Sequence, residues 1–225
     1  MDANDDVRPA ITMAIDVDPI DVRIVNGLAK IGLATRHRAW SEAEASGLTP
    51  TQGQILALLR ASPTGLRLSE LAARLAVTPP TASVAVRTLT AKGLVRKERA
   101  PADARGVVLT LTALGVRQAE RAAGWSDFLL TAIGALTPPE REVFLRALVK
   151  MIRVLQERRE IPVARMCVSC RFFRPYRHDD ADRPHHCAFV DAAFGDRSLR
   201  LDCAEFEPAA PEFAAQNWET FNAGG

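Results

Sequence analysis

All four cysteines of this chain and three of its four histidines lie within residues 167–203. The cysteines follow the spacing Cys-x2-Cys-x16-Cys-x15-Cys, and two histidines directly precede the third cysteine. A Cys-x-x-Cys pair bends the chain so that two thiolates can bind one metal, and two further ligands complete a tetrahedral set. We therefore predict one metal centre per chain. Its predicted ligands are Cys167, Cys170, Cys187 and Cys203, with His185 and His186 as substitute ligands or as hydrogen-bonding groups behind the ligands.

The sequence leaves the nature of this centre open between an iron–sulfur cluster and Zn²⁺, since four cysteines can hold either. A zinc ribbon usually supplies a second closely spaced cysteine pair, whereas here the other cysteines stand singly. The pattern Cys-x-x-Cys-x-Phe, then Cys, then Cys-x-x-Phe resembles small cysteine-rich segments beside certain anaerobic radical enzymes, which hold 4Fe–4S clusters. The cluster is therefore favoured over zinc and over a thiol redox switch. The phenylalanines among the cysteines would shield a cluster or form a small core: Phe172, Phe173, Phe189, Phe194 and Phe206.

The composition is that of an ordinary globular protein, with 48% hydrophobic and 25% charged residues. At 225 residues, the chain can form one substantial core and a small appendage. No apolar run approaches the ~20 residues of a membrane-spanning helix, and the first six residues are unlike a secretory signal because they are acidic. We expect the protein in the cytoplasm, where reduced cysteines in a cluster more often bind metal than form disulfides.

The sequence also lacks the usual motifs of an enzyme. It contains no nucleotide-binding loop, no pair of carboxylates in a recognisable frame and no nucleophile elbow. We therefore predict that the protein is not an enzyme. A redox or electron-transfer protein is the less favoured alternative, because it would need only the cysteine segment.

Positive charge is concentrated in one part of the chain. Residues 66–106 contain eight Lys or Arg against three acidic residues, a net charge of +5, whereas the whole chain has a net charge of only +2. The rest of the chain is therefore slightly acidic. A basic segment on an acidic body is typical of an element that binds phosphate groups.

Local sequence patterns predict helices on both sides of a small basic module. Residues 1–18 read as a loose arm, and an amphipathic helix is expected from Ile20 to about Ala45. Thr49, Ser69 and Thr78 are predicted helix N-caps, and Gly93 a helix end. The β-rich runs 94–99 and 107–111 predict a hairpin. Two long helices should follow, from Thr112 to about Leu136 and from Thr137 to about Arg159, and the second should bury Val143, Phe144, Ala147, Leu148, Met151, Ile152 and Leu155.

The order of these motifs resembles the MarR family of winged-helix regulators. The matching motifs are Leu68-Ser69-Glu70-Leu71-Ala72, Thr78-Pro79-Pro80-Thr81, Lys92-Gly93-Leu94-Val95, Asp103-x-Arg105 and Leu111-Thr112-x-x-Gly115. The resemblance implies a mainly α fold: a winged helix-turn-helix with long flanking dimerisation helices over residues 19–160. Residues 161–225 would be an added cysteine-rich module and tail.

The resemblance also implies partners for the chain. These are double-stranded DNA with a pseudo-palindromic operator, a second copy of the chain and a small-molecule effector. The flanking helices have more apolar surface than one small winged domain can cover, which independently predicts a homodimer. The residues that could contact an effector are His37, Trp40, Trp125 and Phe128, although core packing explains the aromatic ones equally well.

The helix that begins after Thr78 is the predicted recognition helix. Helical periodicity places Ala82, Ala85, Val86 and Leu89 on its inner face. Its outer face lacks long polar side chains apart from Arg87, which favours readout of DNA shape and backbone over direct base readout. The predicted DNA-binding residues are Thr78, Pro80, Thr81, Ser83, Val84, Arg87, Thr88, Arg99 and Arg105, and Asp103 is predicted to support the wing.

Together these patterns predict a homodimeric, sequence-specific DNA-binding transcription regulator whose operator affinity is modulated by an iron–sulfur cluster held by the four cysteines. The alternative is the same regulator with a purely structural zinc site and a small-molecule signal.

Overall fold

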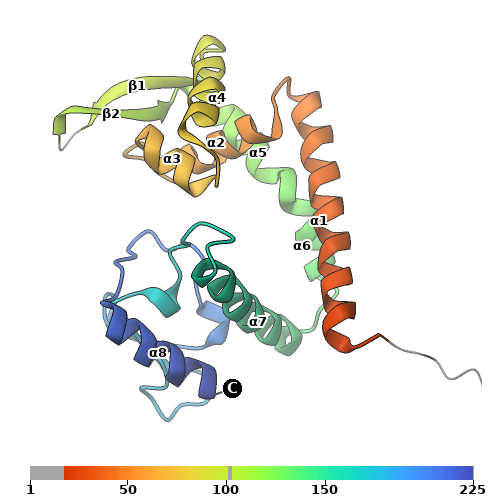
Figure 1. The fold of residues 1–225 in the computed structure, drawn as a ribbon, viewed down its shortest axis with the longest axis vertical. Helices are drawn as coiled ribbons and strands as arrows, with labels where there is room; N and C mark the ends of the chain where they lie inside the picture. The colour runs from red at the N-terminus through yellow and green to blue at the C-terminus, as the bar shows by residue number, and fades with distance from the viewer. Residues whose placement is uncertain (1–17, 101–102, 225) are drawn as a thin grey trace, which may run out of the picture.

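The computed structural model describes residues 18–100 and 103–224, and only the backbone of Ala100 and of residues 103–105. The predicted N-terminal arm therefore lies, apart from Asp18, outside the described residues. The chain is mainly helical, with a winged helix-turn-helix followed by a small cysteine-rich module (Figure 1). None of the described helices is both long and apolar enough to cross a membrane.

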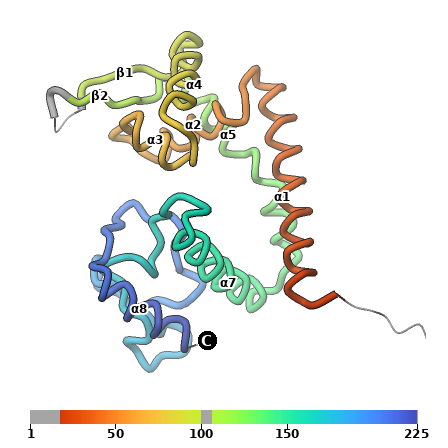
Figure 2. Tube along the Cα trace, viewed as in Figure 1, coloured from red at the N-terminus to blue at the C-terminus, as the bar shows by residue number. Residues whose placement is uncertain are grey.

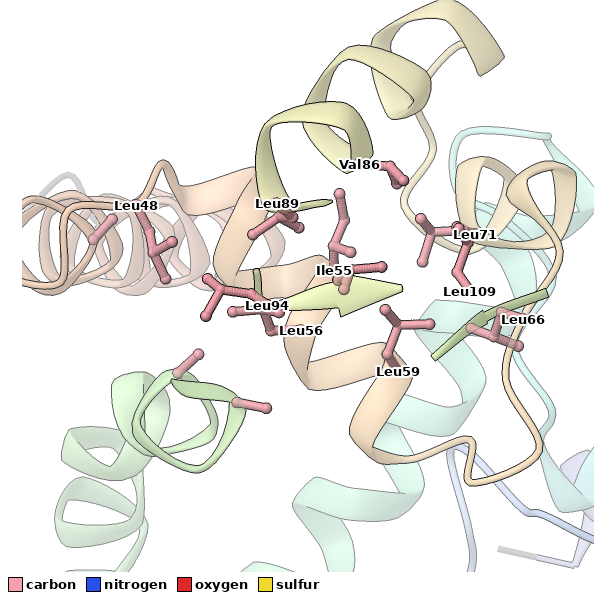
Figure 3. Packing of buried hydrophobic residues seen from close by; sticks show 14 of the residues in the cluster. Leu48, Ile55, Leu56, Leu59, Leu66, Leu71, Val86, Leu89, Leu94 and Leu109 are labelled. Carbon is pink, nitrogen blue, oxygen red and sulfur yellow. The ribbon is translucent and has the colours of Figure 1, made fainter. Parts of the chain in front are cut away.

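The winged domain is built around α2 (Pro50–Arg60), whose Ile55, Leu56 and Leu59 are almost fully buried. Around it lie α1 (Ile20–Ala45), α3 (Leu68–Arg74), α4 (Pro79–Ala91) and the antiparallel pair β1 (Val95–Ala100) and β2 (Asp103–Leu111). Figure 3 shows how leucines from these elements point into the space beside α2. This core holds α3 and α4 as a helix-turn-helix with β1 and β2 as its wing.

Helix caps predicted from the sequence define most of these elements. Thr49 and Gln52 form a reciprocal capping box at the start of α2, with both N···O distances 3.2 Å. The N-cap at Thr78 and the end of α4 at Gly93, with φ +69°, are also confirmed. The prediction for Ser69 was wrong. Helix α3 begins two residues earlier, with Arg67 as its N-cap, and the Glu70 carboxylate accepts a hydrogen bond from the backbone N–H of Arg67 at 2.8 Å.

The long helix predicted after Thr112 is interrupted in the structure. It consists of α5 (Ala113–Ala123), a 3₁₀ turn at Gly124–Ser126 and α6 (Asp127–Ile133). The turn places Trp125 in the core against Gly53 of α2, where a Cβ atom at Gly53 would overlap the indole ring. Burial of this large aromatic ring outweighs the local preference for an unbroken helix.

The cysteine-rich module packs directly on α7 (Pro138–Glu157). It contains a three-stranded antiparallel sheet of β3 (Phe173–Arg174), β4 (His185–Cys187) and β5 (Ala192–Phe194), and it ends in α8 (Pro211–Ala223). Two 3₁₀ turns, η2 (Cys167–Ser169) and η3 (Asp196–Ser198), complete it. Figure 2 shows the chain leaving α7 and folding back on it through α8. Val149 of α7, Phe173 and Phe221 form its core and are at most 2% exposed.

Helix α7 therefore has two apolar faces, and most of the residues predicted to be buried lie on the exposed one, with Ile152 as an exception. Leu145, Val149 and Ile152 pack against the cysteine-rich module. In contrast, Val143 is 70% exposed, and Phe144, Met151 and Leu155 are exposed as well. Helix α1 likewise exposes Ile20, Val25 and Leu33, each by at least 60%, and α6 exposes Leu130. The three helices thus present apolar surface that the described part of the chain leaves uncovered.

Candidate nucleic-acid interface and cysteine cavity

Helix α4 has the two faces that its sequence predicted. Ala82, Val86 and Leu89 are buried against α2 and α3, and Ala85 is partly buried beside them. The opposite face points away from the domain and is exposed at Pro80, Thr81, Ser83, Val84 and Arg87, with Thr88 partly exposed. The inward set fixes the helix, so the outward set is presented on a rigid support.

The N-terminus of α4 offers polar groups to a ligand. The Thr78 hydroxyl accepts a hydrogen bond from the backbone N–H of Thr81 at 3.3 Å, and the two threonine hydroxyls lie 2.9 Å apart. Pro79 occupies the first helical position, where a backbone N–H would have no partner within the helix. Pro80 follows it and also lacks an N–H, so the N-terminus of α4 would attract a phosphate through the positive end of the helix dipole and the two threonine hydroxyls.

The middle of the exposed face is suited to contact base edges. Arg87 is exposed, and a guanidinium can bind a guanine edge or a phosphate. Val84 is 53% exposed, and an apolar side chain at this position can contact a thymine methyl group. The Thr88 hydroxyl donates to the Val84 carbonyl at 3.2 Å, so its hydrogen atom is already engaged within the helix. Arg87 is thus the one long polar side chain among the predicted α4 contacts.

The wing is an antiparallel hairpin in which Val95 pairs with Leu111 and Arg99 with Val107. Arg99 is exposed near its tip, whereas Arg96 forms an ion pair with Glu98 at 2.9 Å and a hydrogen bond with Thr110. The side chains of Asp103 and Arg105 lie outside the described residues. Their predicted roles in supporting the wing and in contacting DNA stay predictions.

The same elements match known proteins. The model of the MarR family matches residues 46–106. MepR from Staphylococcus aureus in complex with DNA is 26% identical with a TM-score of 0.51, and the match covers 58% of this chain and 97% of MepR. MepR in its DNA-binding conformation is 27% identical with a TM-score of 0.53, and the match covers 59% of this chain and 98% of MepR. The MarR family protein Rv2887 from Mycobacterium tuberculosis is 30% identical over 58% of this chain and 95% of Rv2887, with a TM-score of 0.44.

The chain belongs to the MarR family. Because the solved relatives are covered almost completely while about two-fifths of this chain stays unmatched, this MarR-family protein has a segment in addition to the part it shares with them. No match was found among curated proteins. The cysteine-rich module is the main described part that the family does not account for.

The structure brings all four cysteines to the wall of one cavity of about 240 Å³. Cys167 and Cys170 flank the η2 turn, and Cys187 ends β4 opposite Phe173 of β3. Cys203 is held close by backbone hydrogen bonds, since its N–H donates to the Arg165 carbonyl at 2.9 Å and the Cys167 N–H donates to the Arg200 carbonyl at 3.2 Å. The polypeptide itself therefore gathers the predicted ligands. Among the described residues, no three His, Cys, Asp or Glu side chains converge as a site for a single metal ion.

The sulfur atoms of the cavity have polar neighbours at one edge. The Arg200 backbone N–H donates to Cys167 Sγ at 3.3 Å, and its guanidinium donates to Cys203 Sγ at 3.6 Å. The Cys203 thiol donates to the Glu205 carboxylate at 3.3 Å. Burial raises the pKa of the Cys167 thiol above its usual range, the Arg200 N–H lowers it, and the other three cysteines raise it further. A cation in the cavity would relieve the repulsion among four thiolates.

The two candidate histidines lie outside the wall of the cavity as the structure describes it. His185 is fully buried, its Nδ1 accepts from the Tyr176 N–H at 3.3 Å, and its Nε2 lies 2.7 Å from an Asp196 carboxylate oxygen. Both ring nitrogens of His185 are thus engaged. His186 Nδ1 lies 3.2 Å from His178 Nε2. The predicted roles of both histidines at the metal centre stay predictions.

The polar link between α7 and the module was not predicted from the sequence. Arg146 of α7 donates to Asp196 at 2.9 Å and to the Phe221 carbonyl at 2.8 Å, and Asp196 also bonds His185. Burial alone would raise the pKa of Asp196, but hydrogen bonds from His185 and Arg146 lower it below its ordinary value. The spacing of Leu145, Val149 and Ile152 was the available signal, because it marks a second apolar face next to Arg146.

The aromatic residues considered for an effector site divide into two groups. Trp125 is buried in the core of the winged domain and Phe128 is partly buried. Trp40 and His37 are exposed on α1. Trp125 is thus explained by core packing, and the effector remains a prediction.

Proposed function

We propose that this MarR-family protein is a transcription regulator that binds double-stranded DNA as a homodimer. The observation that supports this most directly is the outward face of α4, where Arg87, Val84 and Thr81 are exposed on a helix held by a buried inner face. The basic charge of residues 66–106 lies on the same elements. The structure of MepR with DNA supports the assignment, because that relative shares the winged helix-turn-helix.

The homodimer is supported by the uncovered apolar surface of α1, α6 and α7. Val143, Val25 and Leu130 are each more than 60% exposed in the single chain. Complete burial of one such side chain in an interface would stabilise the dimer by about 1.5–3 kcal/mol relative to leaving it exposed. A two-fold interface formed by these helices would place two recognition helices in successive major grooves, so the operator would be a pseudo-palindrome.

We further infer that the cysteine cavity binds a metal centre, either an iron–sulfur cluster or Zn²⁺, whose occupancy changes operator affinity. This inference is supported by the position of α7 between the module and the proposed dimer interface. The module contacts α7 through Val149, and the opposite face of α7 belongs to the proposed interface. A change that moves the module can thereby change the spacing of the two recognition helices. A purely structural zinc site is the alternative, and it would leave operator affinity unchanged.

Selection from a pool of random DNA duplexes tests the DNA-binding function and identifies the operator in the same experiment. The full chain should enrich a sequence with two-fold symmetry whose half-sites are about one helical turn apart, roughly 10 base pairs. Size-exclusion chromatography with light scattering should show two chains per selected duplex. Failure to enrich any sequence under conditions where the protein is folded would contradict the proposal.

A further inference from the structure

The cysteine cavity is larger than a single metal ion requires. Its volume is about 240 Å³, and among the described residues no three Cys, His, Asp or Glu side chains come together closely enough to hold one ion. In a tetrahedral zinc site, the sulfur ligands lie about 2.3 Å from the ion and leave no space between them to fill. In an iron–sulfur cluster, by contrast, the cysteines would surround a body of several iron and sulfide ions and bind more than one iron. We propose that this cavity holds an iron–sulfur cluster ligated by Cys167, Cys170, Cys187 and Cys203.

The four ligands reach the cavity from separate parts of its wall. Cys167 and Cys170 come from either end of one 3₁₀ turn, Cys187 from the end of a strand, and Cys203 from the segment after η3. Backbone pairing fixes these segments, because Phe173 pairs with Cys187 across β3 and β4 while residues 165–171 bond to residues 200–209. The cavity is therefore a preformed space with cysteines around it.

Most of the rest of the wall is apolar, which would limit the contact of an iron–sulfur cluster with water. Phe172 and Phe189 stand together at the cavity with ring centroids 5.3 Å apart, and Phe173 and Phe194 line another part of it with centroids 6.0 Å apart. Solvent exposure and hydrogen bonds to the sulfurs are the protein's main means of setting cluster stability and potential. These rings also give the phenylalanines among the cysteines a role beyond that of a small core.

The polar edge of the cavity provides the hydrogen bonds. Arg200 is placed to donate to two of the four sulfurs, through its backbone N–H to Cys167 and through its guanidinium to Cys203. A cluster with four thiolate ligands carries net negative charge, and the Arg200 guanidinium would offset part of it. Arg200 is thus a positioning and charge-balancing residue for the cluster rather than a ligand.

The test is chemical analysis of the full-length protein, purified without oxygen and reconstituted with ferrous iron and sulfide. We expect a brown protein with broad visible absorption and with iron and acid-labile sulfide in equal amounts, at about two or about four of each per chain. The Cys187→Ser and Cys203→Ser variants should each retain less than about half of this iron. Ser198→Ala is the matched control, because it removes a side-chain oxygen from the same wall and should retain wild-type iron.

Circular dichroism verifies that each variant is folded, and Arg200→Ala provides a readout that does not depend on losing a ligand. This variant should assemble the cluster but lose iron to a chelator several-fold faster than wild type.

A colourless protein with one tightly bound zinc ion and no sulfide after this treatment would overturn the proposal, as would full iron content in both Cys→Ser variants. The proposal rests on the metal centre inferred above, but its readout is independent of DNA. A protein that binds the operator and holds no cluster is therefore distinguishable from one that holds a cluster and binds no DNA.

Discussion

At the scale of single residues, side chains of the same type have different roles according to what surrounds them. Arg146 is fixed between Asp196 and the Phe221 carbonyl, Arg96 is paired with Glu98, and Arg87 is exposed on α4. An arginine already held by a carboxylate would have to break that ion pair to bind DNA. Helical periodicity was enough to place Arg87 on the outer face of α4. The residues on the inner face are small, apolar and buried, so the two faces are easily told apart in the sequence.

We expect Arg87→Ala to weaken operator binding by about 1–3 kcal/mol, because it removes a charge-assisted contact to a base or a phosphate. Fluorescence anisotropy with the selected duplex measures the dissociation constant over a range of salt concentrations. A base contact would appear as lost discrimination between the operator and single-base variants, and a phosphate contact as a salt dependence reduced by about one charge. Arg183→Ala, an exposed arginine of the cysteine-rich module, is the control. Equal effects of the two substitutions would show that α4 is not the reading element.

At the scale of elements, local signals predicted the winged domain well and the module poorly. The caps at Thr49 and Thr78 depend on residues three positions away, so the sequence alone contains the information. The break at Gly124–Ser126 depends instead on the fit of Trp125 against Gly53, about seventy positions earlier in the chain. The short strands β3 to β5 contain only two or three residues each, too few for an alternating pattern to be recognised.

The cysteine site was also predictable only in part. Cysteine spacing predicted a common site, and the structure places the four side chains around one cavity. The second face of α7 was missed because a helix with two apolar faces has no single clear periodicity, and the partner of that face lies beyond residue 160. Arg146 and Arg200 were missed since nothing in their sequence neighbourhood distinguishes them from other surface arginines.

The Arg146–Asp196–His185 link should hold the module on α7, so we expect Asp196→Asn to lower the free energy of unfolding by about 1–3 kcal/mol. Because the pKa of Asp196 is lowered in the folded state, its stabilisation is complete above the ordinary aspartate range and is lost as pH falls through the lower, folded-state pKa. Urea denaturation from about pH 7 to about pH 3 should thus show the difference between the variant and wild type shrinking below about pH 4.

Asp191→Asn provides the comparison, since Asp191 is 95% exposed and the substitution changes charge in the same way. It should leave the free energy of unfolding nearly unchanged over the same pH range. If Asp196→Asn destabilised the protein no more than Asp191→Asn, the polar link would not hold the module in place.

At the scale of the whole molecule, α7 connects the cysteine cavity to the rest of the protein. Its inner face contacts the module through Leu145, Val149 and Ile152, and Arg153 adds a hydrogen bond to the Val168 carbonyl next to Cys167. Its outer face is apolar and exposed. The hydrogen bond from Arg165 lowers the pKa of Asp202 beside Cys203, and the charge of Arg74 in α3 lowers it further, so the module also lies near the helix-turn-helix. A metal centre bound in the cavity would therefore order a module that lies next to both the proposed dimer interface and the helix-turn-helix.

This arrangement predicts that occupancy of the cavity changes operator affinity by about 1–3 kcal/mol, which corresponds to about 5–150-fold in the dissociation constant. A ligand shifts a two-state equilibrium only as far as its affinities for the two states differ, so the effect requires the module to be better ordered on α7 in the occupied state. Titrating one operator duplex with metal-loaded and metal-free protein at matched salt measures it, with light scattering to verify that both forms are dimers. Cys187→Ser should behave as the metal-free form even after reconstitution, and Ser198→Ala as the loaded form. Equal dissociation constants for loaded and metal-free protein would instead identify the centre as a structural element of the module.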